Sequence, residues 1–265
     1  ATKVSLNTLL ESNLFKKIRN DIENGIFHKG CHRCWQDEAD GVESLRISSN
    51  RKFGELLKKE PVVQVVDFGF GNTCNAACIM CESSSSSKWS DLDKELELID
   101  GNIFSRKEFP TILDSYQWSR NDMKNIRQII HAQNEVFASV EFPKFLKKFS
   151  ESGNPEKTKI LISTNGSIWP SEQILEHLKR FAECHIQISI DGLGKVNNYI
   201  RFPLKWSIVE KNVLKWIELS EKFNIKTTCR CTVSVLNVLY LRELKQWWSD
   251  VSIGRRMSFG HCWFP

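Results

Sequence analysis

The sequence has no apolar run approaching the roughly 18 residues that a membrane-spanning helix needs, so no such helix is expected. Residues 1–7 lack the pattern of a signal peptide. No long block of like charge is present, and 37 basic and 32 acidic residues leave a formal net charge of only +5. So small an excess permits a nucleic-acid partner without favouring one. We expect a cytoplasmic protein with no membrane partner.

The length and composition predict a large folded unit. A chain of 265 residues that is 41% hydrophobic can bury one large core and still carry an appendage. The chain opens without Met, close to a predicted helix. We interpret it as a fragment of a longer protein.

Cysteine is abundant, with nine residues, and most of them are clustered. In a chain of this size, clustering favours metal ligation over disulfides. The most informative cluster is Cys74, Cys78 and Cys81, spaced as C-x3-C-x2-C after a predicted buried strand over 62–70. Three thiolates on one loop suit a four-iron cluster, and they leave one iron free for chemistry. The alternative, a zinc site, would require a fourth ligand.

From residue 61 onward, apolar runs of strand length alternate with amphipathic helical patterns. The predicted strands cover 62–70, 125–132, 158–164, 185–190, 226–233 and 256–261. The predicted helices cover 88–98, 137–149, 172–182, 206–223 and 239–248, and 101–124 is expected to be an insertion with some helix. This alternation predicts an α/β fold, a partial (β/α)6 TIM-like barrel over 61–265 whose active site lies at the carboxyl ends of the strands.

The first 60 residues have a different character. Helical spacing over 5–26 is followed by Cys31 and Cys34, and then by a charged, partly helical stretch over 36–60. We predict a small, mainly helical N-terminal module over 1–60. The other cysteines, Cys184, Cys229, Cys231 and Cys262, are interpreted as buried small side chains. The serine-rich stretch 83–87 is either a flexible turn or a shield for the cysteine site.

Polar residues follow the predicted strands in a recognisable order. Glu135 follows the second strand, Thr164 and Asn165 the third, and Ser189 and Asp191 the fourth. Together with the cysteine triplet, this order resembles the radical S-adenosylmethionine (SAM) superfamily over residues 61 to about 250. The resemblance implies that Cys74, Cys78 and Cys81 bind a [4Fe-4S] cluster and that SAM chelates the fourth iron. It also implies reductive cleavage of SAM to methionine and a 5′-deoxyadenosyl radical, with an electron donor such as flavodoxin or ferredoxin.

The same resemblance assigns roles to the residues after the second and third strands. Glu135 matches the acid of a Gly-Gly-Glu-Pro motif that receives the SAM amino group, although Gln133 and Asn134 stand here in place of the glycines. Thr164 and Asn165 match a Thr-Asn pair that faces the ribose and methionine parts of SAM.

The remaining matches lie nearer the third cysteine and the fourth strand. Ser189 and Asp191 match a Ser-x-Asp-Gly sequence near the ribose. Arg201 matches an arginine that pairs with the SAM carboxylate. Met80 replaces the aromatic residue that often precedes the third cysteine, and its thioether can pack against adenine.

The N-terminal module resembles the end of a SPASM or twitch module. The pair Cys31 and Cys34 is followed by Trp35 and then by the motif residues Glu38, Gly41, Ser44 and Arg46. The resemblance implies an auxiliary [4Fe-4S] cluster with Cys31 and Cys34 as two ligands. The others would come from upstream sequence, from Cys229, Cys231 or Cys262, or from another chain. A zinc site or a free cysteine pair remains an alternative.

The resemblance implies a radical SAM enzyme of the twitch/SPASM subfamily. Members with such modules commonly modify peptides, so a peptide or protein substrate is the leading hypothesis, with a small-molecule substrate as another possibility. A second hypothesis is modification of a nucleotide, sugar or RNA. A third, prompted by the missing glycines before Glu135, is a degenerate barrel that binds a cluster as a partner protein without cleaving SAM.

Overall fold

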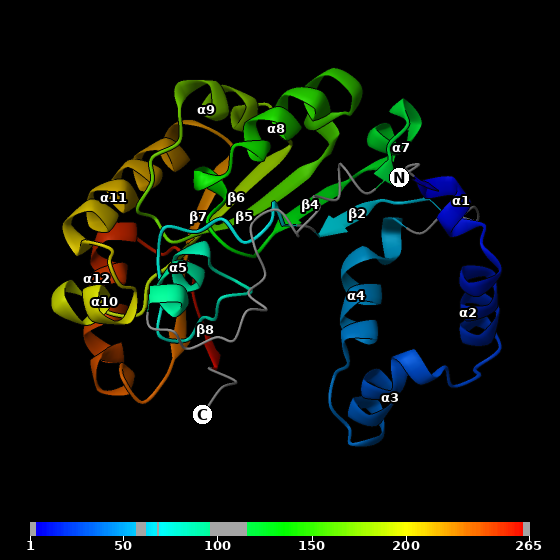
Figure 1. Cartoon of the computed structure of the whole chain (residues 1–265), viewed down its shortest axis with the longest axis horizontal. Coiled ribbons are helices and arrows are strands. Elements are labelled where there is room, and N and C mark those ends of the chain that lie inside the picture. The colour runs from blue at the N-terminus through cyan, green and yellow to red at the C-terminus, as the bar shows by residue number, and fades with distance from the viewer. Residues whose placement is uncertain (1–3, 57–61, 68, 96–115, 262–265) are drawn as a thin grey trace.

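The computed structural model describes residues 4–56, 62–67, 69–95 and 116–261. Its centre is a sheet of six parallel strands in the order β2-β4-β5-β6-β7-β8 (Figure 1). The strands are β2 (Val65–Asp67), β4 (Gln128–His131), β5 (Lys159–Thr164), β6 (Glu183–Ser189), β7 (Ile225–Val233) and β8 (Met257–His261). The sheet is not closed, so the predicted partial barrel is confirmed.

Helices connect the strands. The helices whose side chains pack against one face of the sheet are α7 (Arg120–Asn125), α8 (Glu141–Ser152), α9 (Glu172–Lys179), α11 (Trp206–Lys222) and α12 (Leu241–Ser252) (Figure 1). Two further helices are α5 (Ser87–Glu95) and α10 (Gly194–Ile200). Burial alternates along the strands: in β6, Cys184, Ile186 and Ile188 are fully buried, whereas Gln187 between them is not. Because side chains on a strand point alternately to its two faces, one face packs under the helices and the other is a partly polar, concave face.

The core lies between the sheet and its outer helices. On α8, Phe142, Phe145 and Phe149 recur at helical spacing and are almost fully buried. Trp216 of α11 and Trp248 of α12 complete the apolar layer. At about 25 cal/mol per Å2 of apolar surface removed from water, these large side chains provide much of the stabilisation.

The N-terminal residues form α1 (Leu6–Leu10), α2 (Asn13–Glu23), η1 (Lys29–Cys31), α3 (His32–Ala39), α4 (Leu45–Phe53) and η2 (Gly54–Leu56). The prediction of one helix over 5–26 is wrong, because Ser12 adopts an extended backbone and its side chain caps α2 by accepting from Phe15 N. A short parallel pair, β1 (Val4–Ser5) with β3 (Tyr116–Gln117), links the N-terminal residues to the barrel.

Several other boundaries differ from the predictions. The first strand of the barrel is three residues long rather than the nine of 62–70, and Asn125 ends α7 instead of starting β4. Helix α10 was not predicted, because its seven residues show no clear apolar periodicity. Residues 101–115 of the predicted insertion lie outside the described residues. No helix among the described residues is long and apolar enough to cross a membrane.

The packing predicts a strong contrast between two leucines. Leu178 of α9 is fully buried, whereas Leu214 of α11 is 47% exposed. We expect Leu178→Ala to lower the free energy of unfolding by about 2–5 kcal/mol, because it leaves a cavity in the core. Leu214→Ala should change it by only about 0.5 kcal/mol. Urea denaturation of both variants measures the difference, and equal losses would contradict this description of the core.

Candidate active site

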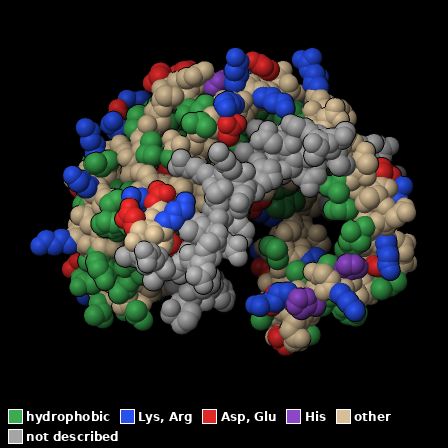
Figure 2. Space-filling model, viewed as in Figure 1, with side chains coloured by type: hydrophobic (Ala, Val, Ile, Leu, Met, Phe, Trp, Pro, Cys, Tyr) green, Lys and Arg blue, Asp and Glu red, His purple; other side chains and the backbone are tan. Residues whose placement is uncertain are grey.

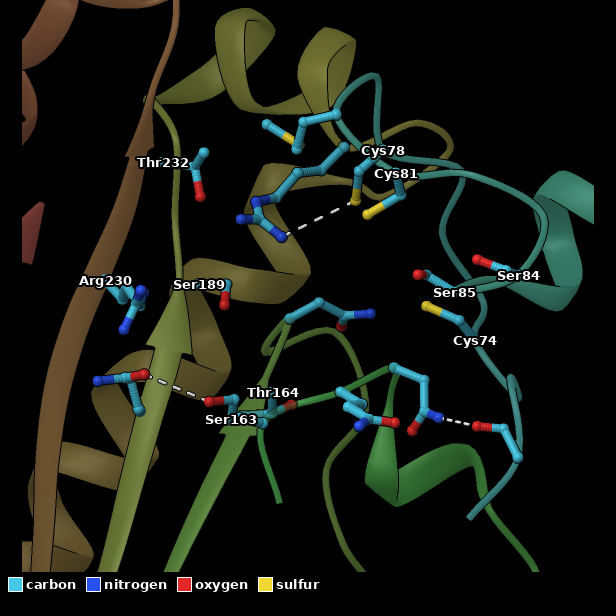
Figure 3. Close-up of a pocket in the computed structure, with 18 residues that line it drawn as sticks. Cys74, Cys78, Cys81, Ser84, Ser85, Ser163, Thr164, Ser189, Arg230 and Thr232 are labelled. Carbon is cyan, nitrogen blue, oxygen red and sulfur yellow. Dashed lines mark hydrogen bonds between the residues drawn. The ribbon is translucent and has the colours of Figure 1, made fainter. Parts of the chain in front are cut away.

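A cavity of about 460 Å3 lies at the carboxyl ends of the strands, and the three thiols of the triplet line it (Figure 3). This volume falls in the range of roughly 300–1,000 Å3 typical of small-molecule and cofactor sites. Most of the predicted site residues line the same cavity: Cys74, Cys78, Met80, Cys81, Thr164, Asn165, Ser189 and Arg201. The fold therefore gathers side chains that are up to 127 residues apart in the sequence (74 to 201) around one volume.

The cysteine loop is tied to the last residue of α10 and to the segment directly after it. Ala77 N donates to Phe202 O at 2.6 Å, and Ile79 N donates to Ile200 O at 2.9 Å. These two bonds flank Cys78 and place its thiol near Arg201, whose Nη1 lies 3.8 Å from Sγ. The loop is thus held on both sides of its central cysteine by backbone bonds.

The serine-rich stretch holds the loop from the other side. Ser86 Oγ donates to Ala76 O at 2.6 Å, and Ser87 Oγ accepts from Cys74 N at 3.1 Å. Ser84 and Ser85 line the cavity. The serines therefore both fix the backbone of the cysteine loop and form part of the cavity wall, which a plain flexible turn would not do.

The three thiols differ in acidity. The Cys81 thiol hydrogen-bonds to Cys78 and, with the nearby charge of Arg201, lowers the pKa of Cys78 to about 7 despite its burial. The same hydrogen bond keeps the proton on Cys81 and raises its pKa. Burial raises the pKa of Cys74 to about 11. Cys78 is therefore the thiol most readily ionised, as a metal ligand must be.

Arg201 has an ion-pair partner inside the protein. Its Nη2 lies 2.7 Å from Asp191 Oδ2, and both side chains are buried. Burial alone would lower the pKa of Arg201, but the charges of Asp191 and Cys78 outweigh it and raise the pKa. Asp191 does not line the cavity, and its Oδ1 accepts from Thr232 N at 2.7 Å. Asp191 thus stands behind Arg201 as its counter-charge.

Glu135 also stands behind the cavity wall. It is fully buried, and its carboxylate accepts from the Thr164 hydroxyl at 2.9 Å and from Asn165 N at 2.7 Å. Burial raises its pKa to about 7, although these hydrogen bonds oppose the shift. Glu135 therefore fixes the end of β5, which carries two of the predicted SAM-contacting residues.

The residue before Glu135 explains why glycine suits this position. Asn134 has a φ of +30°, in the region that favours glycine, and its side chain donates to Gly71 O. Asparagine tolerates this region better than most residues. The backbone conformation that a glycine would allow is therefore retained here without a glycine.

Asn165 connects the strand end to the cysteine loop. Its Nδ2 donates to Asn75 Oδ1 at 2.8 Å, and Asn75 Nδ2 donates to Ser167 Oγ at 2.9 Å. Because Asn75 lies between Cys74 and Cys78, this network sets the position of the loop relative to β5.

Further cavity residues were not predicted as site residues. They are Gly71, Ser84, Ser85, Ala132, Gln133, Asn134, Ser163, Gln187, Arg230 and Thr232. Ser163, Gln187 and Arg230 lie on the concave face, each one residue away from a buried strand position. Because side chains alternate between the two faces of a strand, the predicted strands indicate which residues share the concave face. Considering only the residues at the strand ends did not identify these three residues.

No protein-family model and no curated protein sequence matches this chain. Among solved structures, it resembles histidine-tagged anSMEcpe with bound AdoMet (SAM) at 16% identity and a TM-score of 0.51, over 77% of this chain and 51% of that one. The chain has the fold of the radical SAM enzymes.

Two further structures resemble it at TM-scores of 0.48. Native anSMEcpe with bound AdoMet and Cp18Cys peptide is 18% identical, over 76% of this chain and 51% of that one. Streptococcus suis SuiB bound to precursor peptide SuiA is 13% identical, over 83% of this chain and 46% of that one. The chain therefore spans about half the length of these proteins with the radical SAM fold.

The residues that accompany the N-terminal cysteine pair form one network. Glu38 accepts from the Ser44 hydroxyl and from Arg46 Nε at 3.0 Å. The Arg46 guanidinium lies 4.6 Å from the centre of the Trp35 ring. The pKa of Arg46 is raised chiefly by its hydrogen bond to Glu38 and further by the nearby charges of Cys34 and Cys31. A cation thus stands beside the pair, which suits thiolate ligands.

The remaining described cysteines are core residues. Cys184, Cys229 and Cys231 are fully buried on β6 and β7, as predicted, and burial raises the pKa of each. Cys229 and Cys231 pack in the main core, whereas Cys31 and Cys34 lie on η1 and α3 (Figure 1). Cys262 lies outside the described residues.

The donor set of the cavity fits a four-iron cluster. Among residues 4–56, 62–67, 69–95 and 116–261, no three His, Cys, Asp or Glu side chains are grouped as ligands of one metal ion. In a cluster, each thiolate binds a different iron. The cavity supplies three thiols on one loop, a guanidinium beside Cys78, and enough volume for a further ligand.

The burial of Glu135 predicts a pH effect on stability. Because its pKa rises from an ordinary value of 4.5 to about 7, the folded chain holds this proton over a window in which the unfolded chain loses it. Stability should therefore fall as the pH rises through this window, by up to about 1.4 kcal/mol per pH unit. Glu135→Gln should remove this component. Urea denaturation across the window tests it, and parallel pH profiles for the two proteins would contradict it.

The Asp191–Arg201 pair predicts asymmetric mutant effects. Asp191→Asn leaves the buried Arg201 without its counter-charge and should lower the free energy of unfolding by about 3–5 kcal/mol. The double variant Asp191→Asn/Arg201→Met should recover part of this loss, since no buried charge remains. Urea denaturation measures both. A double variant less stable than the single one would show that the ion pair is not the main effect.

Proposed function

We propose that this chain is a radical SAM enzyme of the twitch/SPASM type that acts on a peptide or protein. The observation that carries the proposal is the convergence of Cys74, Cys78 and Cys81 on one cavity with the polar strand ends of the barrel. In this proposal the protein holds three irons of the cluster through its cysteines, orients SAM and excludes water.

Cys74, Cys78 and Cys81 would hold the cluster. With SAM and one electron from a donor such as flavodoxin or ferredoxin, the cluster would supply radical chemistry: cleavage of SAM to methionine and a 5′-deoxyadenosyl radical able to take a hydrogen atom from the substrate. The three thiolates would each bind one iron. Arg201 would donate to the Cys78 sulfur and offset its charge. A charge-assisted bond of this kind stabilises the thiolate form.

For SAM itself, we propose contacts from the predicted residues that line the cavity. Met80 would pack against adenine, while Thr164, Asn165 and Ser189 would supply hydrogen bonds. Glu135 and Asp191, which lie behind the wall, would act by holding Thr164, Asn165 and Arg201 in place. The retained backbone at Asn134 argues against a degenerate, non-catalytic barrel.

The proposal of a peptide substrate is supported by the N-terminal residues. The network of Glu38, Ser44 and Arg46 around Cys31 and Cys34 fits the resemblance to a SPASM or twitch module, whose members commonly modify peptides. We propose that residues 1–60 are the C-terminal part of such a module, with an auxiliary [4Fe-4S] cluster, and that 61–265 are the radical SAM core.

On the face shown in Figure 2, Lys and Arg side chains are scattered among other types, so this face does not favour RNA.

Anaerobic reconstitution with iron and sulfide tests the proposal. After reduction in the presence of SAM, the protein should release 5′-deoxyadenosine, measured by chromatography. Cys78→Ala should abolish the release, because the cluster loses a ligand. The matched control is Cys184→Ala, a core cysteine outside the cavity, which should retain activity if it folds. If the wild type binds about four irons per chain more than Cys78→Ala does and still yields no 5′-deoxyadenosine, the proposal is refuted.

A further inference from the structure

The two arginines of the cavity differ in their ion-pair partners. Two guanidinium groups line it, those of Arg201 and Arg230, and no Asp or Glu side chain does. Arg201 is paired with Asp191 at 2.7 Å. Among the described parts of the chain, no carboxylate lies within ion-pair distance of Arg230. Arg230 is thus the cavity guanidinium that has no carboxylate partner among these described residues.

The sheet directs Arg230 into the cavity. On β7, Cys229 and Cys231 are buried in the core, so Arg230 and Thr232 belong to the opposite, concave face. Gly260 on the neighbouring strand β8 leaves space for the Arg230 guanidinium, since a Cβ at position 260 would lie only 3.3 Å from Arg230 Nη2. The guanidinium therefore lies across β8 at a point where a side chain would crowd it.

The position of Arg230 separates it from the cluster ligands. In Figure 3, Arg230 lies with Ser163, Ser189 and Thr232, and Cys74 lies at the other side of the cavity. The amino-acid part of SAM is expected at the fourth iron, beside the cysteines. A carboxylate that reaches Arg230 therefore belongs to a different ligand, with Ser163 and Gln187 as neutral hydrogen-bonding neighbours.

We propose that Arg230 is a specificity-determining residue that binds a carboxylate of the substrate, the side chain of an Asp or Glu in a peptide. This inference rests on the proposed function, because it places a peptide in the cavity. A guanidinium suits a carboxylate since its planar fork makes two parallel hydrogen bonds. The substrate peptide is accordingly expected to carry an acidic side chain that enters the cavity.

A randomised peptide display library, selected against the anaerobically reconstituted protein with SAM present, tests this inference. Selected peptides should be enriched in Asp and Glu. Arg230→Gln should abolish the enrichment, whereas Arg242→Gln, an exposed arginine on α12, should preserve it. For one selected peptide, replacing the acid by its amide should weaken binding to the wild type by about tenfold or more, and should have little effect in Arg230→Gln.

The other outcomes each count against the inference. Selection of no peptide, or of peptides without acidic bias, would overturn it. The inference is also overturned if equilibrium dialysis shows that Arg230→Gln weakens the binding of SAM tenfold while the binding of peptide is unchanged. The carboxylate bound by Arg230 would then be that of SAM. Binding does not require SAM cleavage. Acidic selection without 5′-deoxyadenosine would therefore refute the proposed function and leave this inference standing.

Discussion

The backbone hydrogen bonds from Ala77 to Phe202 and from Ile79 to Ile200 are the contacts on which the site depends. They join the cysteine loop to the chain after β6 and so place Cys78 beside Arg201. Backbone donors and acceptors are available whatever the side chains are. Ala77 and Cys78 are buried, so leaving the backbone donor of Ala77 unpaired would be costly. The geometry of the thiols follows from this docking more than from the local sequence.

A second constraint is the balance of buried charge. Asp191, Arg201 and Cys78 form a row in which each charge has a neighbour of opposite sign when the thiol is ionised. Glu135 is treated differently, because it is held by neutral donors and its pKa is raised. Against this background, Arg230 stands out as the cavity cation without a described counter-charge. Asp191 thus neutralises Arg201, whereas Arg230 faces the cavity without a described carboxylate partner.

The strand and helix predictions succeeded where the apolar pattern was long. Strands β5, β6 and β7 and helix α11 lie within a few residues of their predicted positions. Short elements were missed or misplaced, because α10 and the break at Ser12 depend on local caps and contacts rather than on periodicity. Shared membership of the cavity was foreseen for most site residues, since the carboxyl ends of parallel strands meet at one edge.

The sequence alone determined the cysteine spacing, the alternation of strands and helices, and the polar residues at the strand ends. The tertiary structure decided which of those residues face the cavity. Glu135 and Asp191 stand behind it, whereas Arg230 faces into it. The reason is physical: the direction of each side chain is set by partners far away in the sequence, Thr164 for Glu135 and Thr232 for Asp191. Local patterns cannot contain such contacts, because they exist only once the strands are aligned.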